Sequence, residues 1–244
     1  MDLKVAILKQ ALRLDKLGGG RKQTPDVFSV SEVGRCRKET YLKKMGYKNE
    51  IRADTPEDKA RVIMLLNDGR FHQRTVTEYL WQAPGYHITN IEEDRYIFRT
   101  LENGRSYAII GHPDGIVYGV EEKKRAVLEI KGLSRFLCRD FKGNPRLVDE
   151  DIETLQKVYP SAIPQTLLYI EMFETEEGVV IVKNKDTSEL FQFTIKRNKD
   201  RTDKIIERLD VLYMACATST PPVCDFIKSS KECKYCPFPE HCGE

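Results

Sequence analysis

Apolar residues recur at helical spacing along much of the chain. Residues 1–16 form roughly a helical stripe of valine, isoleucine and leucine, with apolar positions at 5, 7, 8, 12 and 14, before Gly18-Gly19-Gly20 interrupts the pattern. The segment 31–45 has Ser29 or Ser31 as a cap and Gly46 as a stop, and the run starting at Thr55-Pro56 has acids in its first turn. The periodicity predicts helices at 1–16, 31–45, 56–81, 151–159, 160–173 and 198–217.

Alternating patterns between 87 and 196 predict strands. The runs IEEDRYIFRT and RSYAIIGHPD flank Glu102-Asn103-Gly104, and Asn-Gly is a strong hairpin signal. A second hairpin, GVVIVKN and ELFQFTIK, is predicted around Lys185-Asp186. Between the hairpins, Gly111–Gly132 is predicted as a strand ending on Asp114, a charged turn, and a strand with Glu129-Ile130-Lys131. Residues 139–150 are predicted as a loop. This order of elements predicts a mixed α/β sheet flanked by helices.

Composition and charge limit the class of protein. With 40% apolar and 32% charged residues, the 244-residue chain is expected to be soluble, with one large domain or a domain and an attached cap. It lacks any run of about 18 apolar residues, and its N-terminus does not resemble a signal peptide. We therefore expect a cytoplasmic protein without membrane contact. The net charge of +2 implies no polyanionic partner by itself, so only local clustering of basic residues does so.

One stretch combines acids and a lysine with core residues. Glu129 and Lys131 point to one side of their strand and Ile130 to the other, because side chains alternate along a strand. If Asp114 lies alongside, two carboxylates and an ammonium converge. Carboxylates suit Mg²⁺ or Mn²⁺, and a metal with a nearby cation suits phosphodiester cleavage. The alternative is a solvated surface hairpin, but the apolar run Val127-Leu128 favours a buried strand.

Two helices add weaker candidates. Gly69 and His72 lie inside the helix that starts at Pro56, where a glycine can permit close packing and a lone histidine is more often a packing residue than a ligand. In PSAIPQTLLYIEMF, Gln165 and Tyr169 are four residues apart and share one helical face.

The seven cysteines indicate metal or cluster ligation rather than disulfides. Their number is odd and no secretory signal is present. Cys233, Cys236 and Cys242 form a Cys-x2-Cys-x5-Cys triplet in the tail. We favour Cys36 as the fourth ligand, with Cys224 and Cys216 as rivals and Cys138 as a small buried hydrophobe. Zinc and an iron–sulfur cluster both accept four thiolates, and either would clasp the two ends of the chain.

Taken in order, these motifs resemble one family. Cys36 in a basic helix, Gly69-x-x-His72, GHPD, LEIK, Gln165-x3-Tyr169 and the cysteine triplet are similar to the RecB-like PD-(D/E)XK nucleases with a 4Fe–4S cluster. The chain most resembles the CRISPR-associated RecB-family exonuclease and, more distantly, the nuclease domain of the AddB helicase–nuclease subunit. The resemblance covers about residues 30–242.

The resemblance implies a role for each matching residue. Asp114, Glu129, the Ile130 carbonyl and His72 would bind Mg²⁺ or Mn²⁺. Lys131 would position the attacking water or stabilise charge on the phosphorus, while Gln165 and Tyr169 would organise the site and contact DNA. The remaining roles are a 4Fe–4S cluster on Cys36, Cys233, Cys236 and Cys242, and nucleic-acid contacts by Arg35, Arg37, Lys38 and Tyr41. For the basic helix, the alternative is a solvated face.

The implied fold is a PD-(D/E)XK restriction-endonuclease-like core with additions at both ends. The expected parts are an N-terminal helix and linker (1–20), a helical region with Cys36 and His72 (21–86), the nuclease core (87–218) and a cluster-binding tail (219–244). Two features depart from the family pattern. The glycine precedes His72 by three residues, whereas the family often has four, and the leading helix with its glycine linker is not part of the pattern.

The implied function is a metal-dependent DNA exonuclease that prefers single-stranded or free-ended DNA. Its setting would be CRISPR spacer acquisition or processing of phage or host DNA, with an integrase or a helicase as partner and homo-oligomers as a further option. The alternative is a non-catalytic nucleic-acid-binding adaptor whose four cysteines form a structural site. An adaptor would be free to lose the candidate catalytic residues, yet Asp114, Glu129 and Lys131 are all present.

Overall fold

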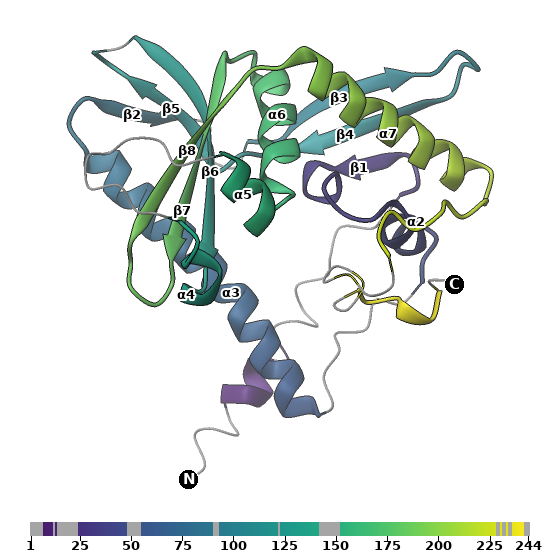
Figure 1. Cartoon of the computed structure of the whole chain (residues 1–244), viewed down its shortest axis with the longest axis horizontal. Coiled ribbons are helices and arrows are strands. Elements are labelled where there is room, and N and C mark those ends of the chain that lie inside the picture. The colour runs from purple at the N-terminus through teal and green to yellow at the C-terminus, as the bar shows by residue number, and fades with distance from the viewer. Residues whose placement is uncertain are drawn as a thin grey trace. The chain divides into compact units, whose positions relative to one another are not determined.

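The computed structural model describes residues 7–11, 13, 24–47, 55–89, 93–121, 123–141, 152–227, 230, 233 and 236–241 (Figure 1). The Gly18–Gly20 linker and Cys242 lie outside these residues. The chain divides into two compact units. The larger is formed within residues 26–35 and 72–214, and the smaller within 1–25, 36–71 and 215–244. None of the described helices is long and apolar enough to cross a membrane.

The larger unit contains two sheets. The first has the order β1-β4-β3, with β1 (Val27–Ser29) parallel to β4 (Ser106–Gly111) and β3 (Arg95–Thr100) antiparallel to it. The second has the order β2-β5-β6-β7-β8. Its strands are β2 (Tyr86–Thr89), β5 (Gly115–Gly119), β6 (Lys124–Leu133), β7 (Glu177–Asn184) and β8 (Leu190–Lys196). Only β6 and β7 are parallel to each other in this sheet, so the predicted mixed α/β architecture is confirmed.

Most predicted elements form close to their predicted bounds. The Asn-Gly hairpin joins β3 to β4, with Gly104 at φ 77°, and the second predicted hairpin joins β7 to β8. The long helices are α3 (Pro56–Gln82) and α7 (Lys199–Ala217). Along the chain, three helices connect β6 to β7: α4 (Arg135–Cys138), α5 (Ile152–Val158) and α6 (Ala162–Phe173).

Two local predictions were wrong. The segment 31–45 is not one helix: it forms the 3-10 helix η1 (Val30–Glu32) and then α2 (Arg37–Lys44). Ser29 and Glu32 form a reciprocal capping box that closes the first turn, and Cys36 begins the second helix as its N-cap. The strand before the acidic motif ends at Gly111 rather than on Asp114. The chain passes to the other sheet through Pro113, which has no N–H for a strand ladder.

The central strand β6 is buried on both faces. Its Leu128 and Ile130 pack with Val76 of α3 and Ile88 of β2. On the other face, Val127 lies beside Gly178 of β7. A Cβ added to Gly178 would be only 2.3 Å from Thr166 Cγ2, so α6 packs closely against the sheet at this point. Because side chains alternate, Val127, Glu129 and Lys131 face α6, while Leu128, Ile130 and Gly132 face α3.

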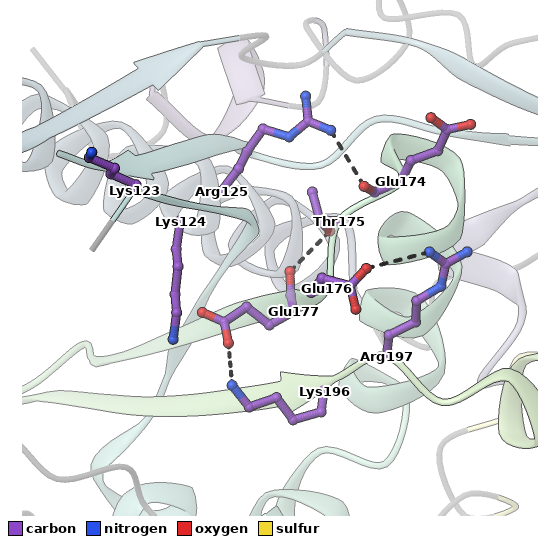
Figure 2. A pocket seen from close by; sticks show the side chains of 9 residues that line it. All are labelled: Lys123, Lys124, Arg125, Glu174, Thr175, Glu176, Glu177, Lys196 and Arg197. Atoms are coloured by element: carbon purple, nitrogen blue, oxygen red, sulfur yellow. Dashed lines mark hydrogen bonds and ion pairs between the residues drawn. The ribbon is translucent and has the colours of Figure 1, made fainter. Parts of the chain in front are cut away.

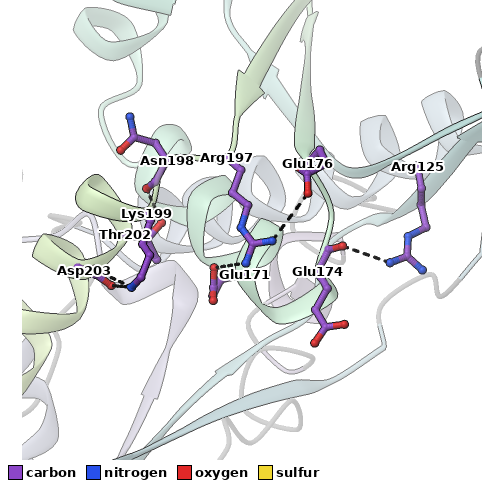
Figure 3. Close-up of polar contacts among 9 residues, drawn as sticks. All are labelled: Arg125, Glu171, Glu174, Glu176, Arg197, Asn198, Lys199, Thr202 and Asp203. Carbon is purple, nitrogen blue, oxygen red and sulfur yellow. Dashed lines mark hydrogen bonds and ion pairs between the residues drawn. The ribbon is translucent and has the colours of Figure 1, made fainter.

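The C-terminal end of α6 is held by Arg125 of β6 and by Arg197, which directly follows β8 (Figure 3). Arg125 Nη2 donates to the Phe173 carbonyl at 2.9 Å, which satisfies one of the orphan carbonyls of the helix end. Arg197 pairs with Glu171 at 3.0 Å. After Arg197, Asn198 accepts from the Arg201 N–H at 3.0 Å and so caps α7. These bonds fix the end of the helix that carries Gln165 and Tyr169.

The smaller unit contains α2, the first part of α3 and the 3-10 helix η2 (Pro239–His241). Asp225 accepts from the Arg37 backbone N–H at 2.7 Å and from its Nε at 2.8 Å. Phe238 is almost completely buried, and Tyr47 stacks edge-on against His241. Among the described residues, no atom outside the backbone of α3 lies within 4 Å of a Cβ placed on Gly69, so these residues show no close packing there.

Candidate active site

Asp114 and Glu129 occupy neighbouring positions at the end of the β5–β6 pairing. The register of these strands places Gly115 opposite Leu128, so Asp114 follows as the neighbour of Glu129. Asp114 Oδ2 accepts the Ile130 N–H at 2.5 Å, and its side chain thereby continues the ladder in place of a backbone carbonyl. Its Oδ1 accepts from Gln73 Nε2 at 2.6 Å. The Asp114 carboxylate is thus fixed in orientation by two donors.

Lys131 lies against Glu129, two residues away on the same face of β6. Its ammonium donates to Glu129 Oε1, and Glu129 is only 4% exposed. The Lys131 nitrogen also lies 5.7 Å from the ring centroid of Tyr159. Burial alone would lower the pKa of Lys131, but Glu129, Tyr159 and Asp114 raise it above its ordinary value. Lys131 is therefore a cation at neutral pH and not a base.

Helix α6 covers this face of the sheet with Gln165 and Tyr169. Both side chains are buried, one helical turn apart. Burial raises the pKa of Tyr169, and the carboxylates of Glu129 and Asp114 raise it further, so the phenol stays neutral within reach of both acids. Gly111 lets the ring approach β4, because a Cβ there would stand 2.7 Å from Tyr169 Cε1.

His72 does not join the two carboxylates. The Nδ1 of His72 lies 3.2 Å from Lys183 Nζ. Its ring packs over Gly132, where an added Cβ would be 3.3 Å from the ring carbon Cδ2. Gly132 points to the α3 side of β6, opposite to Glu129 and Lys131. Across the part of the chain that the structure describes, no three histidine, cysteine, aspartate or glutamate side chains gather around one point.

Sequence reasoning missed two residues of this cluster. Gln73 follows His72 on α3, and its amide donates to Asp114. Tyr159 stands between α5 and α6 and presents its ring to Lys131. Neither residue belongs to a sequence motif: Gln73 simply follows a histidine, and Tyr159 precedes a proline. Only the packing of α3 and of the α5–α6 connection against β6 gives these residues a role.

The described cysteines do not form a four-thiol group. Cys36 Sγ lies 3.6 Å from Cys224 Sγ, which the sequence had left as a rival ligand. Cys233 and Cys236 have their own backbone contacts, and Cys242 lies outside the described residues. Burial raises the pKa of the Cys36 thiol. Cys138 is 3% exposed in α4, as expected for a small buried residue.

The predicted nucleic-acid contacts differ in their surroundings. Arg35 is exposed and Lys38 is half-buried. Arg37 is held by Asp225 at 2.7 Å. Tyr41 is only 5% exposed, so its ring offers no face on which a base could stack. The apolar residues of α2, such as Tyr41 and Leu42, are buried in the core of the smaller unit. The sequence pattern did not separate this apolar face of the helix from its basic face.

Comparisons with known proteins identify the fold. No protein-family model and no curated protein matches the chain. The crystal structure of the protein SSO0001 matches with a TM-score of 0.60 at 17% identity, over 99% of this chain and 96% of that one. An alkaline exonuclease from Laribacter hongkongensis matches with a TM-score of 0.50 at 14% identity, over 80% and 90%. The chain shares its fold with these two proteins. At these identities the likeness concerns the fold alone.

Proposed function

We propose that this protein is a metal-dependent DNA exonuclease of the PD-(D/E)XK type, acting on single-stranded or free-ended DNA. The observation that carries the proposal is the cluster of Asp114, Glu129 and Lys131 at the end of the β5–β6 pairing. Glu129 is buried and Asp114 is half-buried, and charged groups removed from water in this way, with Lys131 beside them, are costly to maintain without a use. The fold shared with the alkaline exonuclease agrees with this use.

The donor set of the cluster fits Mg²⁺ or Mn²⁺. Asp114 and Glu129 would bind the ion through carboxylate oxygens, together with the Ile130 carbonyl, and hard oxygen donors are the ones these ions prefer. His72 is the least secure member of the set because it faces the other side of β6. When bound, the ion activates a water and offsets negative charge on the phosphate.

The protein's own groups supply orientation and positive charge. Gln73 and the Ile130 N–H hold Asp114, which fixes the direction of its carboxylate. Lys131 is protonated and donates to Glu129. Its ammonium can donate to a phosphate oxygen as charge builds up during attack on the phosphorus. Tyr169 is a neutral phenol whose pKa is raised by burial and by both acids, and at 6% exposure its proposed role is to organise the site.

A nuclease assay tests the proposal. Single-stranded DNA labelled at its 5′ or 3′ end is compared with a closed circle, in Mn²⁺ or EDTA, for wild type, Lys131→Ala and Glu129→Ala. Tyr118→Leu, on the exposed side of β5, is the matched control. We expect metal-dependent loss of the linear strand in wild type and the control only. Equal cutting by Lys131→Ala and Glu129→Ala would refute the assignment.

The alternative function is a non-catalytic nucleic-acid-binding adaptor. The observation that favours it is the engagement of both acids by protein groups, Asp114 by Gln73 and Glu129 by Lys131. An adaptor would bind DNA equally well in Mn²⁺ and in EDTA and would cut nothing. Titration of folded wild type with Mn²⁺ separates the two, because only the nuclease proposal requires saturable binding that Glu129→Ala abolishes.

We also propose that Cys36, Cys233, Cys236 and Cys242 bind a 4Fe–4S cluster with a structural role. The chemistry of four thiols fits the cluster, and the contact of Cys36 with Cys224 makes Cys224 the competing ligand. Anaerobic protein should be brown and contain iron and sulfide. Cys36→Ser and Cys224→Ser identify the fourth ligand, since only loss of a true ligand removes the colour. One stoichiometric zinc would replace the cluster assignment.

The resemblance suggests two cellular settings for such an enzyme. In CRISPR spacer acquisition the partner would be an integrase, and in phage or host DNA processing it would be a helicase. Co-purification of the catalytically inactive Lys131→Ala protein with each candidate distinguishes these settings.

A further inference from the structure

Two neighbouring hollows lie where β6 and β7 begin. The first, about 480 Å³, has charged walls, and the second, about 400 Å³, has a mostly apolar floor formed by the five-stranded sheet. Lys124 and Glu177 line both hollows, so the two adjoin. Neither hollow is lined by Asp114, Glu129 or Lys131. Along β6, Lys124 stands five residues before Glu129, or about 17 Å at the rise of an extended strand.

The charged hollow has a surplus of positive charge (Figure 2). Glu177 pairs with Lys196, and Glu176 lies 3.9 Å from Arg197. The remaining charged residues are Glu174 and three cations, Lys123, Lys124 and Arg125, and within the described part of the chain none of these cations forms an ion pair. The lining residues are Lys123, Lys124, Arg125, Glu174, Thr175, Glu176, Glu177, Lys196 and Arg197.

Arg125 is held in place without losing its charge. Its Nη2 donates to the Phe173 carbonyl at 2.9 Å and to the Glu174 carbonyl at 3.5 Å, as Figure 2 shows for Glu174. Carbonyl oxygens orient a guanidinium but do not neutralise it, and a pre-oriented guanidinium recognises a phosphate group well. The charged hollow therefore suits a phosphate.

The apolar hollow offers an exposed aromatic ring. Tyr86 on β2 is 43% exposed and stands opposite Gly119 of β5 in the strand register. Gly119, the residue opposite Tyr86, has no side chain that could cover the ring. Val117 and Val179 form part of the floor beside it. A flat apolar group fits between the tyrosine ring and this floor, as a nucleobase does on aromatic platforms.

We propose that the adjoining hollows bind one nucleotide unit. Its phosphate lies in the charged hollow against Lys124, whose side chain shares a face of β6 with the apolar hollow, and its base lies against Tyr86. Lys123 and Arg125 border the charged hollow from its other sides and add positive charge. A phosphate alone would leave the apolar hollow empty, and an apolar ligand alone would leave the cations unmatched. The same unit occurs in a free nucleotide and in a DNA strand, and both are tested. The inference goes beyond the nuclease proposal, because none of the lining residues belongs to the catalytic cluster.

Calorimetric titration in EDTA tests the site directly. Full-length wild-type protein is titrated with dTMP, thymidine and inorganic phosphate. We expect dTMP to bind at least ten-fold more tightly than either part. Tyr86→Leu should weaken binding of dTMP about 5- to 150-fold, the range for loss of one base–aromatic stack, while Tyr86→Phe retains it. The double variant Lys123→Ala/Lys124→Ala should weaken binding of both dTMP and phosphate.

Matched variants separate the site from the rest of the surface. Tyr118→Leu removes the neighbouring tyrosine of β5, which lines neither hollow, and Lys204→Ala removes an exposed lysine of α7. Both should bind dTMP as wild type does. A ten-nucleotide oligo-dT is titrated in the Lys131→Ala background. Tyr86-dependent binding of the oligonucleotide that is tighter than that of dTMP would assign the site to a DNA strand, and binding no tighter than that of dTMP would assign it to a free nucleotide.

Two results would overturn the inference. One is binding of dTMP no tighter than that of phosphate, together with oligonucleotide binding that ignores both Tyr86 and the lysine pair. The other is a loss of dTMP binding in Tyr118→Leu as large as in Tyr86→Leu. Failure of the nuclease proposal looks different: Lys131→Ala and Glu129→Ala would keep cutting whatever the hollows bind. Thermal unfolding of each variant confirms that the fold is retained.

Discussion

Replacing Gln73 with leucine tests how the Asp114 carboxylate is held. Leucine has a similar volume but no donor, so the change removes the 2.6 Å hydrogen bond to Asp114 Oδ1 and leaves the Ile130 N–H as donor to Oδ2. A hydrogen bond to a charged group contributes about 1.5–3 kcal/mol. Part of the loss will be offset by water, because Gln73 is only half-buried. We expect the free energy of unfolding to fall by about 1–2 kcal/mol.

The same substitution should weaken metal binding more than it weakens the fold. Loss of a group that orients a metal ligand typically costs about 10- to 100-fold in affinity or activity. Mn²⁺ binding is measured on the full chain by calorimetry, and cutting rates are measured over a range of Mn²⁺ concentrations. If Gln73 acts by orienting Asp114, high Mn²⁺ will restore much of the lost rate.

Gln82→Leu is the control, because it makes the same change on an exposed position of the same helix. It should leave Mn²⁺ affinity unchanged. If Gln73→Leu bound Mn²⁺ as tightly as this control and unfolded at the same urea concentration, the reasoning would be wrong. The hydrogen bond to Asp114 would then have no energetic consequence.

Three further results are expected. Gly178→Ala should destabilise the fold by about 1–3 kcal/mol, because the added methyl group overpacks against Thr166. Gly69→Ala, where a Cβ meets open space, should stabilise the fold by about 0.5–1 kcal/mol. Urea unfolding measures both changes. Burial lowers the pKa of Lys131, but Glu129 raises it more, so we expect the Lys131 ammonium to stay protonated as the pH rises. The pH profile of the cutting rate tests this expectation. A fall in rate with an apparent pKa near 8 that depends on Lys131 would contradict it. Burial, with two nearby carboxylates, raises the pKa of Cys138 from 9.0 to about 11. The raised pKa of the Cys138 thiol therefore adds to the free energy of unfolding in full below pH 9, and this contribution is lost as the pH rises toward 11. Urea unfolding as a function of pH should show this loss in wild type and not in Cys138→Ala.

The positions of helices and hairpins were readable from local patterns. The Asn-Gly turn between β3 and β4 and the start of α3 at Pro56 depend on residues adjacent in sequence, and both form as predicted. The break between η1 and α2 was missed because the helical stripe over 31–45 is continuous in sequence. The helix is broken at Cys36, whose φ of −58° and ψ of 130° are not helical and start a new helix.

The candidate site was only partly accessible from sequence. Alternation along a strand predicts that Glu129 and Lys131 share a face, and they do. That Asp114 stands next to Glu129 depends on the register of β5 against β6, which a sequence pattern does not give. The contribution of Gln73 depends on how α3 packs across Leu128 and Ile130.

By itself, the sequence determined which residues are chemically able to act: two acids and a lysine on short apolar strands, a histidine and a glutamine–tyrosine pair on helices, and a cysteine-rich tail. Tertiary structure decided which of these meet. It turned His72 toward Lys183 on the opposite face of β6, placed Cys36 against Cys224, and buried Tyr41. The physical reason is that chemistry is a property of single side chains, whereas proximity comes from strand register and helix packing between segments far apart in the chain.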